Sequence, residues 1–165
     1  MAYTDTTFAT VLTRVVARLQ SSLSLTDATC YLTADRRRQP MSPPSVAFYT
    51  VAPGPGDFDQ GMLDGGGREQ LCANPATLYV TIWTKVQRDE PGHATAMLTD
   101  ATDGLVALMD GVLESLCTHA LLDGSGNEIL REPLSPLGWE APEELSRDLD
   151  CLHIRLSAVF DWNLD

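Results

Sequence analysis

The chain has 165 residues, of which 44% are hydrophobic, and its formal net charge is −12 at pH 7. This length fits one folded domain with a core of its own, and no apolar run approaches the ~20 residues that cross a bilayer. The acidic balance argues against a nucleic-acid-binding protein that works by counterion release. It is compatible with a protein surface that nucleic acid passes without binding, because like charges repel each other.

We expect one domain over residues 1–165, with a flexible insertion at about 52–70. The first residues show no charged region followed by an apolar stretch, so we expect no signal peptide and folding in a cytosol. The cysteines lie 34 to 45 residues apart and form no C-x-x-C pair, which predicts free structural thiols. They are Cys30, Cys72, Cys117 and Cys151.

The first predicted element is an amphipathic helix over Thr4–Ser22. Its apolar residues recur at three- and four-residue steps. Asp5, Thr6 and Thr7 offer oxygens that can cap its start. A short strand is predicted at Ala28–Thr33.

The next segment, Ala34–Pro44, is predicted to be a loop, because its prolines would interrupt a central strand. It holds the only basic run of the chain, Arg36, Arg37 and Arg38. Two interpretations remain open: a solvated loop tip, or a contact with an acidic patch on a neighbour, oriented by charge complementarity. Ser45–Val51 is rich in β-branched and aromatic residues and is predicted to be a strand.

The least ordered stretch is predicted at Ala52–Gly67, which contains six glycines, two prolines and three aspartates. Such a composition cannot by itself offset the entropy of ordering. A loop of this length in a compact domain is usually functional or disordered. Two interpretations stay open here, plain disorder or a loop that becomes ordered only in an assembly. The candidate contact residues in this loop are Asp57, Phe58, Asp59, Met62, Leu63 and Asp64.

Two longer elements follow. Ala76–Val86 alternates with apolar or aromatic side chains on both faces, which predicts a central strand. Pro91–Leu122 contains the second predicted helix. Gly104 and Gly111 lie seven residues apart in it and would share a face, each costing ~1 kcal/mol relative to alanine. This repeated cost suggests close approach of another backbone, from the protein's own sheet or from another subunit.

The last third of the chain ends in the clearest pattern. Asp123–Asn127 is predicted to be a turn, Glu128–Arg131 a short strand and Pro133–Leu145 irregular. In Cys151–Trp162 every second residue is apolar, which places the apolar set on one side of a long strand and a mostly polar set on the other. His153 belongs to the polar set and is expected to be a surface or interface residue.

The predicted order is a helix, two or three strands, a helix and two strands. This order indicates an α+β fold, with one mostly antiparallel sheet flanked by two main helices on one face. The sequence contains no phosphate loop, no Gly-x-Ser-x-Gly and no His-Glu-x-x-His motif, and its histidines have no metal-site spacing. We therefore expect no catalytic, cofactor-binding or metal-binding residues, and no enzyme.

Taken together, these segments resemble the tail terminator (tail completion) proteins of long-tailed bacteriophages. The resemblance covers nearly the whole chain and is one of order, length and pattern. The segments that carry it are the helix Phe8–Leu19, the Gly/Asp-rich insertion Pro53–Gly67, the strand Leu78–Trp83, the helix Leu98–Leu116, the segment Arg131–Trp139 and the alternating end Leu152–Trp162.

The resemblance implies a homo-oligomeric ring, usually hexameric, at the head-proximal end of the tail tube. Such a ring is assembled in the host cytoplasm and lies in the virion at the junction of tail and neck. It would stop polymerisation of the tail tube protein, present a surface to the neck (connector) proteins and let DNA pass through its lumen without specific binding; no membrane is involved. Six copies at −12 each would carry −72, which gives the acidity a purpose. The family has no catalytic residues to carry over.

On this resemblance, the Pro53–Gly67 loop would become ordered against a neighbour or the tube, and Arg36–Arg38 would meet an acidic partner surface. The exposed edge of the sheet would pair or pack between subunits. One alternative is a neck or head-completion connector protein of the same virions. Another is a small cytosolic enzyme whose site assembles from Asp57, Asp59 and His93 in a closed pocket.

Overall fold

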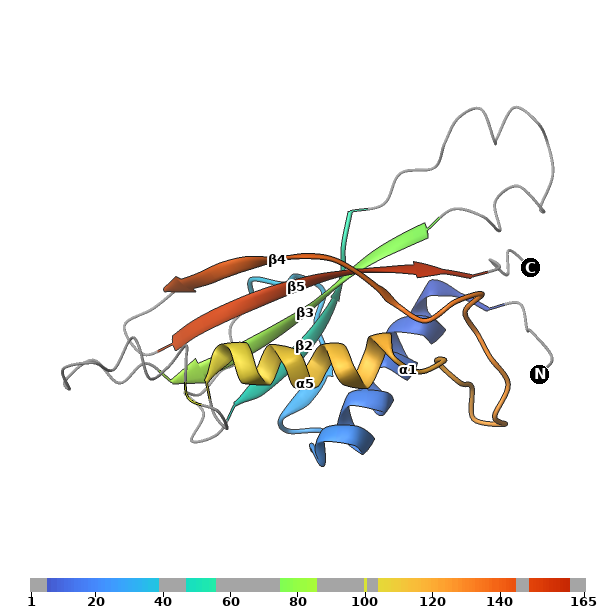
Figure 1. Ribbon diagram of the computed structural model, residues 1–165, viewed down its shortest axis with the longest axis horizontal. Coiled ribbons are helices and arrows are strands. Elements are labelled where there is room, and N and C mark those ends of the chain that lie inside the picture. Colours follow the sequence, from blue (N-terminus) through green and yellow to red (C-terminus); the bar gives the residue numbers. More distant parts are fainter. Residues whose placement is uncertain are drawn as a thin grey trace.

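The structure, a computed structural model, describes residues 6–38, 47–55, 75–85, 100, 104–144 and 149–160 (Figure 1). The helices and strands of this part of the chain follow the predicted order of a helix, two or three strands, a helix and two strands, with three strands between the helices. They are α1 (Phe8–Leu23), β1 (Cys30–Leu32), β2 (Phe48–Pro53), β3 (Pro75–Lys85), α5 (Leu105–Cys117), β4 (Ser135–Glu144) and β5 (Leu149–Val159).

The strands form one mixed five-stranded sheet in the order β1-β2-β3-β5-β4. Only the β1–β2 pair is parallel among these strands; the other three pairs are antiparallel. The predicted α+β fold with a mostly antiparallel sheet is therefore confirmed. β3 occupies the middle of the sheet, as its two apolar faces predicted, and β5 pairs with it from Pro75↔Val159 to Lys85↔Leu149.

Helix α1 begins where a side chain can replace a missing backbone partner. The Thr7 hydroxyl accepts a hydrogen bond from the Thr10 amide at 3.2 Å, so Thr7 is the N-cap. At the other end Ser24 adopts a left-handed conformation with φ of 55°, and its amide donates to the Gln20 carbonyl. The helix predicted at Thr4–Ser22 is thus confirmed, with its start at Phe8.

Helix α5 begins later than the glycine spacing suggested. Gly104 precedes the helix with extended backbone (φ −68°, ψ 146°) and serves as its N-cap. The expectation that Gly104 and Gly111 share a helical face is therefore wrong. A Cβ added at Gly111 would lie 3.6 Å from Leu23 Cδ2, so its neighbour is an α1 side chain rather than another backbone.

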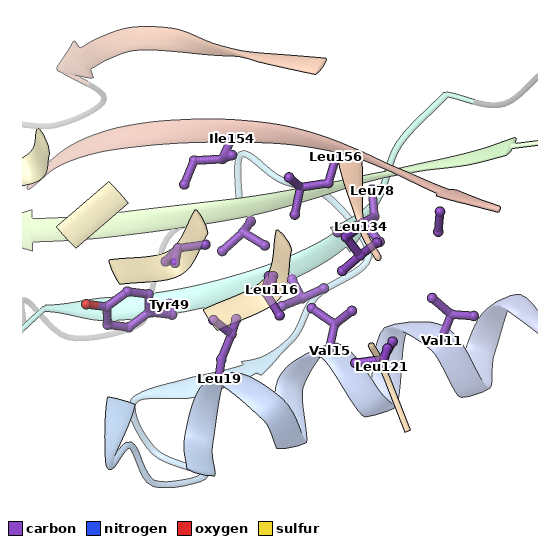
Figure 2. Close-up of a cluster of buried hydrophobic side chains, with 14 of the residues drawn as sticks. Val11, Val15, Leu19, Tyr49, Leu78, Leu116, Leu121, Leu134, Ile154 and Leu156 are labelled. Atoms are coloured by element: carbon purple, nitrogen blue, oxygen red, sulfur yellow. The ribbon is translucent and has the colours of Figure 1, made fainter. Parts of the chain in front are cut away.

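Both helices cover the same face of the sheet, which we call the inner face (Figure 1). α1 contacts β1 and β2, α5 contacts β3 and β4, and the helices contact each other. Figure 2 shows Val15 and Leu19 of α1 and Leu116 of α5 directed at the side chains of the sheet. The strands contribute alternate residues to this core: Tyr49, Val51, Ala76, Leu78, Val80, Ile82, Leu152, Ile154, Leu156 and Ala158.

The apolar set predicted for the terminal strand is confirmed as core. Leu152, Ile154 and Leu156 are at most 1% exposed, and Phe160 beyond the strand is also buried. Phe160 stacks on Phe8 of α1 with ring centroids 6.1 Å apart. Trp162, the last apolar residue of the pattern, lies outside the described residues.

Residues 135–144, predicted to be irregular, form the edge strand β4, so that prediction is wrong. The physical reason is the edge position. Its pairing with β5 shifts register between Pro136 and Gly138 and again between Glu140 and Glu143. Prolines and bulges are tolerated on an edge strand because one side of its backbone needs no sheet partner.

The segment between α5 and β4 contains a turn but no strand among its described residues. The Asp123 carboxylate accepts hydrogen bonds from the Ser125 and Asn127 amides at 2.7 and 2.9 Å, which confirms the predicted turn. Beyond the turn, Glu128 forms one isolated bridge with Leu122. The short strand predicted at Glu128–Arg131 is therefore wrong.

Candidate assembly surface

The side of the sheet away from α1 and α5, which we call the outer face, is lined by buried polar and aromatic side chains. Thr50 of β2, Thr81 and Trp83 of β3, and Cys151 and His153 of β5 are each at most 1% exposed. The Trp83 indole donates a hydrogen bond to Thr50 Oγ1 at 2.9 Å, so its polar group is satisfied. The outer face is thus a second packed layer and not a bare surface.

His153 was predicted to be a surface or interface residue, and that prediction is wrong. The pleat does place it away from the core, as its position in β5 indicated. However, the segment that follows β1 crosses the outer face, and the Arg36 carbonyl lies 3.5 Å from Thr81 Oγ1. His153 sits beside Thr81 in the adjacent strand and is enclosed.

A chain of hydrogen bonds connects His153 to that segment. Thr81 Oγ1 is 2.8 Å from His153 Nδ1, and Cys151 Sγ is 3.7 Å from His153 Nε2. Thr81 thus links the His153 ring to the backbone of the arginine segment, and the imidazole tautomer sets which atom donates in the Thr81–His153 contact.

Arg36 anchors this segment with its side chain as well. Its guanidinium lies over the Tyr79 ring, 4.4 Å from the centroid, and Nη1 forms an ion pair with Glu140 Oε1 of β4. The hydrogen bond from Arg36 lowers the pKa of Glu140, and the positive charges nearby act in the same direction. Arg36 is thus held within its own chain, across β3 and β4.

Arg37 and Arg38 differ from Arg36, because both are exposed. The turn that carries them is closed by Asp35, whose carboxylate accepts from the Arg37 amide at 2.9 Å. The Asp35 carbonyl accepts from the Arg38 amide at 3.1 Å. The basic run, for which a solvated loop tip and a partner contact were both open, therefore divides into one internal anchor and two exposed arginines.

The other predicted contact residues cannot be placed on this surface. Residues 56–74 lie outside the described part of the chain, as does His93 of the alternative enzyme site. The predicted contact residues in that range are Asp57, Phe58, Asp59, Met62, Leu63 and Asp64.

The two edges of the sheet are unequal. At one edge β1 has only three residues and exposes Leu32. At the other edge β4 has ten residues and carries two exposed large apolar side chains, Leu137 at 48% and Trp139 at 56%. Trp139 is paired with the core residue Ile154, and directly paired residues point to the same side of a sheet, so Trp139 lies on the α5 side.

Sequence reasoning missed Tyr79, Thr81 and Glu140 as partners of the arginine loop. The polar and aromatic alternation of Ala76–Val86 was a usable indication, because it showed that β3 presents a second face. Glu140 offered no indication, because its segment was predicted to be irregular.

The described residues offer little reactive chemistry. Within them, no group of three or more His, Cys, Asp and Glu residues could hold a metal ion. Cys30, Cys117 and Cys151 are not joined in disulfides, as predicted, and Cys72 lies outside the described residues. Burial, with a contribution from Asp27, raises the pKa of Cys30 to about 12, so this thiol stays protonated at neutral pH. None of the helices in the described ranges is long and apolar enough to cross a membrane.

The fold and this surface define an α+β protein with one sheet, helices on one face and an anchored basic loop on the other. No protein-family model matches the chain. No curated protein matches it either.

Proposed function

We propose that this protein is a structural virion protein, a tail terminator that forms a hexameric ring on the head-proximal end of a phage tail tube. In this role it stops tube polymerisation and joins the tail to the neck. The observation that supports the proposal best is the pair of unequal sheet edges, a three-residue β1 and a ten-residue β4 with exposed Trp139. A contact between two unlike edges is head-to-tail, and head-to-tail contacts close into rings when the rotation permits.

The form of the β4 edge indicates how such a contact would be made. Its two register shifts and its two prolines, Pro136 and Pro142, interrupt the regular hydrogen-bonding edge; natural proteins use such interruptions to prevent open-ended strand pairing. A neighbouring subunit would therefore contact the side chains of Leu137 and Trp139, and would not add a strand to the sheet by backbone pairing. An exposed tryptophan is also a residue type that often dominates binding energy at interfaces.

The acidity of the chain fits the same role. A ring of six copies would carry −72, and like charge along its lumen would let DNA pass without specific binding. The anchored loop with Arg37 and Arg38 would meet an acidic partner surface, since complementary charge orients association. No catalytic step is needed for this function.

Light scattering of the purified protein, alone and with tail tube protein, tests the proposal, together with electron microscopy of tubes assembled in its presence. We expect a ring at the tube end and shorter tubes. Trp139→Ser should weaken ring assembly, whereas Leu122→Ser, at an exposed apolar residue of the turn region, should not. A protein that stays monomeric and leaves tube length unchanged would contradict the proposal. Binding to portal and not to tube would favour the connector alternative.

A further inference from the structure

The exposed arginines on the outer face form a pre-organised basic site. We call Arg37 and Arg38 the dibasic loop. Arg36 fixes the backbone beside them through Glu140 and Tyr79 and through the Thr81 hydroxyl. A loop that is already ordered has less entropy to lose on binding, so its two charges are well suited to an acidic partner surface.

The solvent side of α5 carries the opposite charge. Val106, Asp110 and Glu114 are exposed and lie four residues apart, so they form one line along the helix, which we call the α5 stripe. Leu105–Cys117 contains no Lys or Arg. Within the described ranges the one ion pair is Arg36–Glu140, so neither stripe carboxylate is paired there. Like charges at this spacing repel each other in the isolated chain.

These two surfaces cannot meet within one copy. The dibasic loop belongs to the segment on the outer face, where the Arg36 guanidinium covers Tyr79. α5 packs against β3 and β4 on the inner face (Figure 1). Because the sheet separates them, a contact between loop and stripe requires two molecules and is heterologous, so each copy offers one surface to each neighbour.

We propose that the dibasic loop of one copy docks on the α5 stripe of the next copy. The partner is a second copy of this chain, selected by the complementary charges of the two surfaces. Val106, at 42% exposure, supplies apolar area within the stripe, and Trp139 lies on the same side of the sheet as α5. Closure of this contact into a ring rests on the proposed function; the contact itself rests on the two surfaces.

A charge-reversal experiment tests the contact. The loop variant Arg37→Glu/Arg38→Glu and the stripe variant Asp110→Lys/Glu114→Lys each place like charges at both interfaces of every copy. We expect either variant alone to associate about tenfold or more weakly than the unchanged protein, as measured by light scattering across a concentration series. An equimolar mixture should recover the original size, because each variant complements the other in an alternating assembly.

Controls separate this contact from folding and from net charge. All four substituted side chains are exposed, so circular dichroism and thermal unfolding should be nearly unchanged. Asp27→Lys changes an exposed acid outside both surfaces and should leave association intact. Variants that assemble as before, or a mixture that stays dissociated, would overturn the contact. If rings of such variants still cap tubes, the proposed function stands and the contact between loop and stripe is wrong. If the unchanged protein remains monomeric with tube protein present, the contact and the proposed function are both refuted.

Discussion

Two threonines of β3 differ in the partners of their hydroxyl groups. Thr81 Oγ1 lies 2.8 Å from His153 Nδ1, whereas Thr84 Oγ1 is buried without a hydrogen-bond partner among the described residues. Thr81→Val keeps the shape but takes this partner from His153, so we expect the free energy of unfolding to fall by about 1–3 kcal/mol. Thr84→Val removes an unpartnered hydroxyl and should leave stability unchanged or higher. Urea unfolding of both variants measures the difference, and equal losses would contradict the assigned network.

The ion pair between Arg36 and Glu140 should make stability depend on pH in one direction. Arg36 lowers the pKa of Glu140, so the stabilisation is complete above the ordinary glutamate pKa of 4.5 and is lost as pH falls through the lowered pKa. The Glu140 side chain is 44% exposed, so Glu140→Gln should lower stability at pH 7 by only about 0.2–1 kcal/mol.

The same substitution should have no effect at the acid end of the range. Unfolding curves at several pH values should show Glu140→Gln and the unchanged protein converging as the pH falls below 4.5. Exposed Glu132 offers a matched control, and Glu132→Gln should show a smaller loss at neutral pH. A constant gap between the Glu140 variant and the unchanged protein at every pH would show that the carboxylate charge is not the cause.

At the scale of elements, strand prediction worked where the strand lies inside the sheet and failed at its edge. β3 and β5 bury at least one full face, so selection for apolar residues at every second position leaves a visible period of two. β4 is an edge strand with bulges, prolines and exposed Leu137 and Trp139. Residues 135–140 show no such period, because none of them is buried.

Gly111 inside α5 and Gly54 just after β2 should respond oppositely to alanine. A Cβ at Gly111 in α5 would make an ordinary 3.6 Å contact with Leu23 Cδ2, so Gly111→Ala should raise stability by about 0.5–1 kcal/mol through helix propensity. A Cβ at Gly54 would lie 2.9 Å from the Thr77 carbonyl oxygen, and Gly54→Ala should therefore destabilise. Thermal unfolding of both variants tests this; a lower midpoint for Gly111→Ala would show that α1 and α5 cannot accept the added methyl.

At the scale of the whole molecule, the connection between β2 and β3 should matter for assembly and not for folding. The strands are adjacent and antiparallel, with Pro53 opposite Leu78, so a shorter connection can still join their ends. We expect deletion of Asp57–Gly66 to leave a folded monomer and to abolish ring assembly. Circular dichroism reports the first outcome and sedimentation velocity the second. A deletion variant that still sediments as a ring would remove this loop from the assembly surface.

The arginine run shows how tertiary contacts divided a group that is uniform in sequence. Arg36, Arg37 and Arg38 are chemically alike, and the sequence offered the same two interpretations for all three, a solvated loop tip or a partner contact. The fold brings Glu140, 104 residues away, to Arg36 and leaves the other two exposed. No local pattern contains that distinction, because it depends on the strand order β1-β2-β3-β5-β4, which places β4 beyond β5 and within reach of the loop.

The amino-acid sequence by itself determined α1, β3 and β5, because residues at a regular spacing in each of them share one buried face. It also determined the Asp123 turn, which is closed by its own side chain. Only the tertiary structure decided that β4 is an edge strand, that His153 is enclosed and that Arg36 is internal. The physical reason is the distance along the chain over which each property is decided. Periodicity reports which side of an element is apolar, whereas burial of a polar side chain depends on which distant segment crosses above it.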